Sequence, residues 1–327
     1  MICASGIAKY FGGKRALGPV SFEIGRGETV GFLGLNGAGK TTLLRILAGD
    51  LRPSAGSLSV DGEDALHDPL AVRRRVGFLP EQPPLYPDMA VGDYLRFAGR
   101  VRGMSAAEIQ LRVAEVEGLL GLASVRHELI RNLSQGYRQR VGLGQAVVHG
   151  PELVVLDEPS HDLDPAQIVE MRALLGTLKH QHTILVSSHN LHEISQTCDR
   201  LLVLDAGEII ASGTEADLSS GWLGANRIEV AVRPPRSVDG ESAPTLTDQV
   251  ASAVLALKGI DAVQDVTLVG EDPDGLILIV EATEDRRAEV CRELVDLGYG
   301  VVWLGRSRQK LENVFLELVR GGDGGRD

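Results

Sequence analysis

The sequence predicts an α/β domain followed by a small α+β domain. Three observations predict this: strand patterns alternate with helical patterns before residue 224, the pattern changes near that residue, and a glycine-rich loop stands between an apolar run and a helical pattern. The 327 residues suffice for about two domains that each bury a core. We place the domains at 1–223 and 224–320, and expect a disordered tail at 321–327.

Composition and charge narrow the class of protein. The chain is 43% hydrophobic and 24% charged, as soluble globular proteins are. Its formal net charge of -12 argues against general nucleic-acid binding, which needs a basic surface. The three cysteines lack metal-like spacing and are expected to be reduced thiols. No apolar run approaches the roughly 20 residues that span a bilayer, and the first residues lack a signal-peptide pattern. A membrane process would therefore need another chain to cross the membrane.

The elements of the first domain follow from periodicity and capping residues. The residues up to 34 read as short strands with tight turns, and Thr29–Leu33 reads as a buried strand. A helix is predicted from Thr41 to Ala48. The stretch 75–150 is expected to be mostly helical, because a capping-box pattern at Ser105 precedes apolar residues at helical spacing.

Further strands and a helix are predicted before residue 224. The apolar runs 153–156 and 183–186 have the pattern of buried parallel strands. Asp164 and Pro165 form a cap and first-turn pair for the helix between them.

Beyond residue 224 the pattern predicts a ferredoxin-like order, β-α-β-β-α-β, with one helix added. The expected elements are a strand at 228–232, a helix at 246–257, strands at 263–269 and 276–282, a helix at 286–297, a strand at 301–304 and a last helix at 309–319.

The loop 34–41 has the pattern of a phosphate-binding loop. Its glycines let the backbone curl so that N–H groups point at phosphate oxygens. Lys40 adds a positive charge for the terminal phosphates, and Thr41 offers a hydroxyl to Mg²⁺. The residues of this region that we assign to the nucleotide are Gly34, Asn36, Gly37, Ala38, Gly39, Lys40, Thr41 and Thr42.

A carboxylate pair follows the apolar run at 153–156. Asp157 lies at the carboxyl end of a predicted parallel strand, where it can hold Mg²⁺ directly or through water. Glu158 comes next, so its side chain points the other way and can polarise a water beside the terminal phosphate. An Asp-Glu pair alone is usually solvated, but its place after a phosphate-binding loop and an apolar strand favours a functional site.

Three further motifs accompany the glycine-rich loop and the carboxylate pair along the chain. Gln82 lies in a proline-rich loop, Leu133-Ser134-Gln135-Gly136-Tyr137 opens a predicted helix, and His189 follows a predicted strand. Ser134 is a candidate N-cap, and Gly136 permits close backbone approach. A helix N-terminus of this kind favours a phosphate.

In this order, the five motifs resemble those of the nucleotide-binding subunits of ABC transporters, over residues 1 to about 223. The resemblance implies a P-loop ABC ATPase fold, with a core sheet, an antiparallel β subdomain and an inserted helical subdomain at about 85–150. It implies hydrolysis of ATP with Mg²⁺. It assigns Glu158 as the catalytic base and His189 as a switch residue at the γ-phosphate.

The resemblance implies further roles that the residues alone do not. Gln82 is expected to touch Mg²⁺, beside Thr41 and Asp157, and to couple to a membrane subunit. Ser134 and Gly136 are expected to contact the nucleotide of a partner subunit, so that complete sites form only in a dimer. Phe11 is expected to stack on adenine, with Tyr10 as the alternative.

Two features depart from the common family pattern. The signature reads Leu-Ser-Gln-Gly-Tyr in place of Leu-Ser-Gly-Gly-Gln, a form that resembles exporter ATPases associated with gliding motility and drug efflux. Asp162 stands where the family usually has glycine. Aspartate tolerates unusual backbone angles, but its charge near bound phosphates is expected to affect the hydrolysis rate more than nucleotide binding.

The predicted function is that of the ATP-hydrolysing subunit of a bacterial ABC exporter. It would work as a homodimer or heterodimer beneath a separate integral membrane permease, at the cytoplasmic face of the membrane, without nucleic acid. The segment 310–318 resembles the small domain that follows this ATPase in many exporter subunits.

Two alternatives remain beside this prediction. One is a soluble ABC-type ATPase acting on nucleic acid or ribosomes, but such relatives carry paired ATPase units or long insertions. The other is a catalytically slow regulatory module, against which intact Lys40, Asp157, Glu158 and His189 argue. The sequence names neither the cargo nor the permease.

Overall fold

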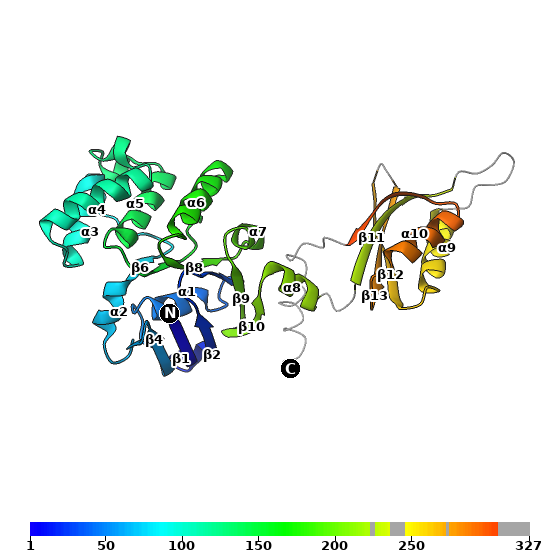
Figure 1. Cartoon of the computed structure of the whole chain (residues 1–327), viewed down its shortest axis with the longest axis horizontal. Helices are drawn as coiled ribbons and strands as arrows, with labels where there is room; N and C mark the ends of the chain where they lie inside the picture. The colour runs from blue at the N-terminus through cyan, green and yellow to red at the C-terminus, as the bar shows by residue number, and fades with distance from the viewer. Residues whose placement is uncertain (223–225, 236–245, 273–274, 307–327) are drawn as a thin grey trace. The chain divides into compact units, whose positions relative to one another are not determined.

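The computed structural model describes residues 1–222, 226–235, 246–272 and 275–306 (Figure 1). The chain divides into two compact units, Met1–Glu215 and a second that begins at Ala216. Helix α8 (Glu215–Trp222) lies at this division, and the predicted boundary at 223/224 falls at the far end of that helix. Within the described ranges, no helix has both the length and the apolar character that crossing a bilayer requires.

A six-stranded sheet in the order β10-β9-β3-β8-β7-β6 forms the centre of the first unit. The neighbours from β9 to β6 are parallel, and β10 runs antiparallel to β9. Every residue of β3, β7 and β8 is buried, as expected for parallel strands covered on both faces. The strands predicted from 29, 153 and 183 are therefore confirmed. The six strands are β3 (Thr29–Leu33), β6 (Val76–Leu79), β7 (Leu153–Leu156), β8 (Thr183–Ser188), β9 (Arg200–Asp205) and β10 (Glu208–Gly213).

The prediction for 75–150 missed one strand, because its first residues form β6. This run of four residues is too short for its period to distinguish strand from helix. Gly77 is required within it, since a Cβ there would lie 2.0 Å from the carbonyl oxygen of Ala146. The glycine therefore lets the signature helix α5 (Gln135–Val147) pack closely on the edge of the sheet.

Two other parts of the first unit flank the core sheet (Figure 1). An antiparallel sheet in the order β2-β1-β4-β5 consists of β1 (Ile2–Phe11), β2 (Lys14–Ile24), β4 (Ala55–Val60) and β5 (Glu63–Asp64). The helices α3 (Val91–Val101), α4 (Ala106–Leu119) and α5 gather apart from that sheet, within the helical segment predicted at about 85–150. The remaining helices of the unit are α1 (Lys40–Leu47), α2 (Pro69–Arg75), α6 (Pro165–Leu178) and α7 (Leu191–Ser195).

Helix starts follow the predicted capping chemistry. Ser105 and Glu108 form the complete capping box of α4. The side chain of Asp164 accepts a hydrogen bond of 2.9 Å from the amide of Gln167, and Pro165 is the first residue of α6. Both caps are confirmed.

The described part of the second unit has the predicted element order. Strands β11 (Asn226–Arg233), β12 (Val263–Asp272), β13 (Gly275–Ala282) and β14 (Gly300–Arg306) form a sheet in the order β12-β13-β11-β14, with every pair antiparallel. Helices α9 (Leu246–Lys258) and α10 (Arg287–Asp296) lie where predicted and contribute Ala253, Leu257, Val290 and Leu294 to its core. The predicted helix at 309–319 and the tail lie outside the described residues.

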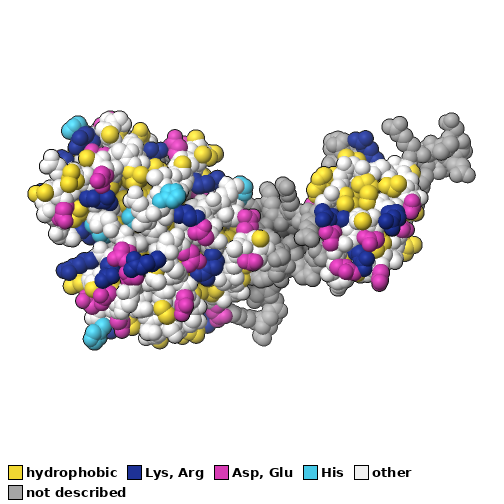
Figure 2. Space-filling model, in the orientation of Figure 1, with side chains coloured by type: hydrophobic (Ala, Val, Ile, Leu, Met, Phe, Trp, Pro, Cys, Tyr) yellow, Lys and Arg dark blue, Asp and Glu magenta, His cyan; other side chains and the backbone are white. Residues whose placement is uncertain are grey.

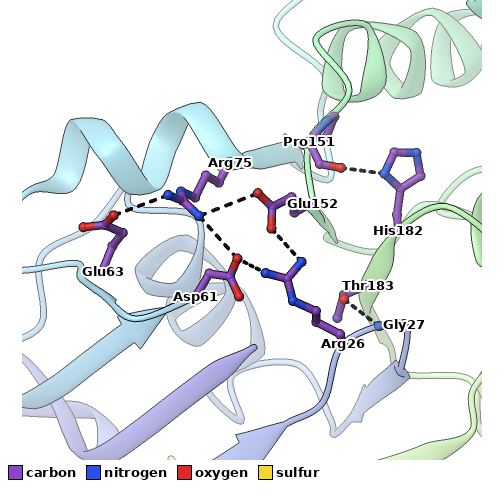
Figure 3. Close-up of polar contacts among 9 residues, drawn as sticks. All are labelled: Arg26, Gly27, Asp61, Glu63, Arg75, Pro151, Glu152, His182 and Thr183. Carbon is purple, nitrogen blue, oxygen red and sulfur yellow. Dashed lines mark hydrogen bonds and ion pairs between the residues drawn. The ribbon is translucent and has the colours of Figure 1, made fainter.

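A cluster of charges joins several segments of the first unit (Figure 3). Arg26, in the turn before β3, pairs with Asp61 and with Glu152, the latter at 2.9 Å. Arg75 at the end of α2 pairs with Asp61 at 3.3 Å, with Glu63 at 3.3 Å and with Glu152 at 3.6 Å. The cluster thus ties the antiparallel sheet to α2 and to the residue before β7.

Asp61 is the member of this cluster whose removal should cost most, because its side chain is only 11% exposed. A hydrogen bond with Glu152 holds the pKa of Asp61 below its usual range against the effect of burial, and Arg26 and Arg75 act the same way. A depressed carboxyl pKa stabilises the fold above the unfolded value of about 3.9, and this stability is lost as the pH falls through the folded value.

We therefore expect Asp61→Asn to lower the free energy of unfolding at pH 7 by about 1–2 kcal/mol. The deficit should shrink when urea unfolding is repeated below about pH 4. Asp88→Asn is the matched control, because its pair with Arg131 involves an aspartate side chain that is 83% exposed. An equal effect of both substitutions would contradict a special role for the cluster.

Candidate active site

Four neighbouring strands end at one edge of the core sheet and deliver the predicted site residues there. In the order β3-β8-β7-β6 all neighbours are parallel. The loop 34–39 follows β3, His189 follows β8, the pair Asp157 and Glu158 follows β7, and Gln82 comes shortly after β6. Because the carboxyl ends of parallel strands share an edge, residues far apart in sequence meet.

A cleft of about 510 Å³ opens at this edge. Phe11 lines the cleft and is 52% exposed, so its ring face is free to stack. Tyr10, the alternative, is not among the residues that line it, and this favours Phe11. The predicted residues that line the cleft are Phe11, Asn36, Gly37, Gly39, Lys40, Thr41, Thr42, Glu158 and His189.

The loop between β3 and α1 depends on its glycines. Gly39 is the N-cap of α1 with a φ of 103°, and a Cβ at that position would lie 2.9 Å from the carbonyl oxygen of Ala16. A Cβ on Gly34 would lie 2.6 Å from the carbonyl oxygen of Leu204. Only glycine fits both places, so the backbone approaches its neighbours closely and leaves the cleft side open.

Lys40 and Glu158 form a buried ion pair on the floor of the cleft. Their charged atoms lie 3.3 Å apart, and their side chains are 6% and 10% exposed. The Lys40 ammonium also donates hydrogen bonds to the carbonyl oxygens of Gly34 at 2.8 Å and Leu35 at 3.3 Å. The other carboxylate oxygen of Glu158 lies 2.8 Å from Nδ1 of His189. The predicted lysine, carboxylate and histidine are therefore in direct contact.

Asp157 occupies the other side of the same edge. It lines a groove of about 590 Å³ together with Thr41 and Gln82, the other two predicted metal ligands. Burial raises the pKa of the Asp157 carboxyl, while hydrogen bonding by Ser187 and Thr41 opposes that effect. Hydroxyl, carboxylate and amide oxygens suit Mg²⁺, which usually binds one or two carboxylates and completes its shell with phosphates and water. The donor set therefore fits this ion.

Ser134 and Gly136 lie away from the cleft in the single chain. Ser134 is the N-cap of α5, as predicted, and its hydroxyl accepts a hydrogen bond of 3.4 Å from the Tyr137 amide. Gly136 allows a close approach of α6, since a Cβ there would lie 2.9 Å from Cδ of Gln167. Neither residue lines the cleft, so their contact with nucleotide stays a prediction.

The sequence interpretation missed Ser187 as a site residue. Its hydroxyl donates a hydrogen bond of 2.7 Å to Asp157 and accepts one of 2.9 Å from the amide of Glu158. From the neighbouring strand it therefore orients the Asp157 carboxylate and fixes the backbone of Glu158. The available signal was a pair of hydroxyl residues, Ser187 and Ser188, between the apolar run that ends at Val186 and the candidate residue His189. Lys14 and Arg15, which follow Phe11 closely in the sequence and also line the cleft, were missed as well.

Asp162 adopts the backbone conformation that glycine favours. Its φ is 59°, which confirms that aspartate tolerates the unusual angle expected there. Its side chain is 70% exposed and lies 3.5 Å from Nε2 of His161. Its effect on the hydrolysis rate stays a prediction.

The buried carboxylate of Asp157 should lower the free energy of unfolding. A carboxyl whose pKa is raised on folding destabilises the protein above that raised value, and the cost disappears at lower pH. Asp157→Asn keeps the size of the side chain and removes the charge. We expect its melting temperature at pH 7.5 to rise by about 2–4 °C, which corresponds to about 1 kcal/mol, while Mg²⁺-dependent ATP hydrolysis is lost. An unchanged or lower melting temperature would show that the charge is fully compensated.

Comparison with known proteins agrees with this geometry. The family model described as ABC transporter matches residues 17–161. An uncharacterised ABC transporter ATP-binding protein of Bacillus subtilis, YxlF, is 37% identical over 67% of this chain and 72% of its own length. The daunorubicin resistance ATP-binding protein DrrA3 of Streptomyces coeruleorubidus is 33% identical over 97% of this chain and 95% of its own.

A solved structure is similar over the first unit. The ABC transporter cassette MJ0796, described as bacterial and solved as a dimer, superimposes with a TM-score of 0.60 at 26% identity. The match covers 65% of this chain and 98% of the cassette.

Proposed function

Because the chain belongs to the family of ABC transporter ATP-binding proteins, the ATP-hydrolysing subunits of transport systems, we propose that it powers an exporter by closing as a dimer around ATP beneath a separate membrane permease. The observation that carries this proposal is the contact of Lys40, Glu158 and His189 in one cleft, with Thr41 and Asp157 beside it. Export is supported by DrrA3, whose name describes resistance to a drug. A soluble or purely regulatory ABC-type module is the less favoured alternative.

The ion pair of Lys40 and Glu158 suggests how ATP starts the reaction. Phosphate oxygens entering the cleft attract the Lys40 ammonium and weaken its pair with Glu158. The Glu158 carboxylate then accepts a proton from the attacking water, while His189 holds its second oxygen and orients it. Nucleotide binding and activation of the base are thus linked through one lysine.

Mg²⁺ would be held by Thr41, Asp157 and Gln82, and when bound it neutralises charge that develops on the phosphates. Ser187 keeps Asp157 in place for this role through its 2.7 Å hydrogen bond. Phe11 offers its ring face to adenine and holds Lys9 5.2 Å from the ring centroid. The loop residues Gly34, Asn36, Gly37, Ala38, Gly39 and Thr42 complete the cradle.

The dimer part of the proposal rests on the start of α5. The exposed Ser134 caps this helix of 13 residues, whose N-terminus favours an anion and does not line the cleft that holds Lys40. A second copy or a related subunit would supply the nucleotide for Ser134 and Gly136. MJ0796 was solved as a dimer, which supports this arrangement.

The permease would dock in a groove beside Gln82. Two adjoining hollows share Asp50, Phe78, Arg102 and Gln145, and they extend from Gln82 to the exposed side chain of Leu70. Arginines and apolar side chains alternate along this groove, which suits an amphipathic segment of the permease with acidic residues. Through this contact the chain would lie at the inner face of the cell membrane.

The domain boundaries belong to the same proposal. We assign 1–223 to the nucleotide-binding domain and 224–320 to a ferredoxin-like domain, whose described strands have the sheet order and antiparallel pairing of that fold. Nucleic acid is no part of the proposal, because the net charge is -12 and charges of both signs are interspersed over the visible face of the first unit (Figure 2).

Glu158→Gln should separate ATP binding from hydrolysis. The amide keeps the size of the side chain but cannot act as a base, so we expect kcat to fall about 10²–10⁴-fold while ATP affinity stays within a few-fold. The variant with ATP and Mg²⁺ should elute as a dimer in size-exclusion chromatography, and without ATP as a monomer. Wild-type turnover in this variant would remove Glu158 from its proposed role.

Leu70→Glu should uncouple the chain from a permease without harming basal hydrolysis. Leu70 is 62% exposed and lines the proposed docking groove, so a negative charge there should oppose an acidic partner segment. We expect loss of co-purification with the permease encoded beside this chain. Leu111→Glu is the matched control on α4, where the side chain is 67% exposed outside that groove. Equal loss with both variants would place the docking surface elsewhere.

A further inference from the structure

His161 stands between two carboxylates at the mouth of the cleft. Its Nε2 lies 3.5 Å from Oε1 of Glu81 and 3.5 Å from Oδ1 of Asp162. Ionised carboxylates only accept hydrogen bonds, so favourable contact with both requires a proton on Nε2. Glu81 immediately precedes Gln82, whereas His161 lies in the loop after Glu158. The imidazole therefore connects two loops that come from different strands.

A backbone turn links the position of His161 to that of Glu158. The amide of His161 donates a hydrogen bond of 3.0 Å to the carbonyl oxygen of Glu158. The Glu158 carboxylate in turn contacts Lys40 and His189. A displacement of the imidazole is therefore transmitted, through three residues of chain, to the proposed catalytic base.

The loop 158–162 borders two hollows and contains two residues with strained backbone angles. It lies between the cleft and a second hollow of about 180 Å³, and Glu158 and His161 line both. The loop begins and ends in the left-handed region, with φ values of 48° at Glu158 and 59° at Asp162. Residues with side chains hold such angles only where surrounding contacts impose them.

We propose that His161 is a positioning residue that ties the loop 158–162 to Glu81 and keeps Glu158 against Lys40 until nucleotide enters. The inference deepens the proposed function, because it rests on the role given there to Glu158. An imidazolium attracts both carboxylates more strongly than a neutral imidazole, which has a single N–H to direct at them. Histidine is the side chain that changes charge near neutral pH.

Other charged and titratable side chains line the same cleft as His161, and the test has to separate their effects from that of His161. Lys40 comes from α1, His189 follows β8, and Lys14 and Arg15 lie across the cleft. His189 is present unchanged in every variant compared. The difference between two proteins at one pH therefore reports on His161 rather than on His189.

The test compares wild type with His161→Gln at pH 6 and pH 8, without nucleotide, by amide hydrogen exchange of residues 158–163. We expect exchange at pH 6 to be about two- to fivefold faster in the variant, the range of a partly exposed ion pair. At pH 8 the two proteins should agree within the error of the method. Glu81→Gln should reproduce the variant, and Glu115→Gln, which removes an exposed pair on α4 at 2.7 Å, should behave as wild type.

Steady-state hydrolysis gives a second readout that a merely structural residue would not produce. We expect His161→Gln to raise kcat at pH 6 about two- to fivefold and to leave the KM for ATP unchanged. Equal hydrogen exchange in wild type and His161→Gln at pH 6, or the same difference between them at both pH values, would overturn the proposed role of His161. Absence of turnover in every protein would contradict the proposed function alone, because the exchange experiment needs no hydrolysis.

Discussion

The buried contact between Lys40 and Glu158 is the constraint on which the site depends. Removing two charges from water is costly unless each is paired and hydrogen-bonded. Lys40 satisfies this requirement with one carboxylate and two carbonyl oxygens, and Glu158 does so with the ammonium and His189. The pair satisfies both charges within the cleft, and the proposed mechanism gives each partner a further role. In that mechanism a phosphate would compete with the Glu158 carboxylate for the Lys40 ammonium.

This contact exists because parallel strands bring distant segments to one edge. Lys40 follows β3 through a glycine-rich loop, Glu158 follows β7, and β8 lies between these two strands. Ser187 at the end of β8 donates a hydrogen bond to the Asp157 carboxylate and accepts one from the Glu158 amide. These two bonds connect β8 to the residues that follow β7. Hydrophobic burial of all three strands fixes the edge, and the polar residues of these strands lie at their first position or their last two positions, as Thr29, Thr183, Ser187 and Ser188 do.

Local pattern was enough to predict much of this arrangement. The strands β3, β7 and β8, the caps at Ser105, Ser134 and Asp164, and the element order within the described residues from 226 to 306 are confirmed. The short strand β6 was missed because its four residues carry no usable period, and its parallel pairing with β7 is what identifies it. Ser187 and the contacts of His161 were missed for a different reason. Each acts through a partner on another strand or loop, and a single sequence does not say which residues those partners are.

The N-terminus of α1 lines the cleft, whereas that of α5 does not. Gly39 and Lys40 are among the lining residues, but Ser134 and Gly136 are not. The Ser134 hydroxyl accepts the capping hydrogen bond and can still donate its own O–H to an anion. An anion placed before this helix would gain from several backbone N–H groups at once. In the proposed dimer, a twofold axis would bring the N-terminus of α5 of each copy to the cleft of the other, since an isologous interface presents the same surface on both chains.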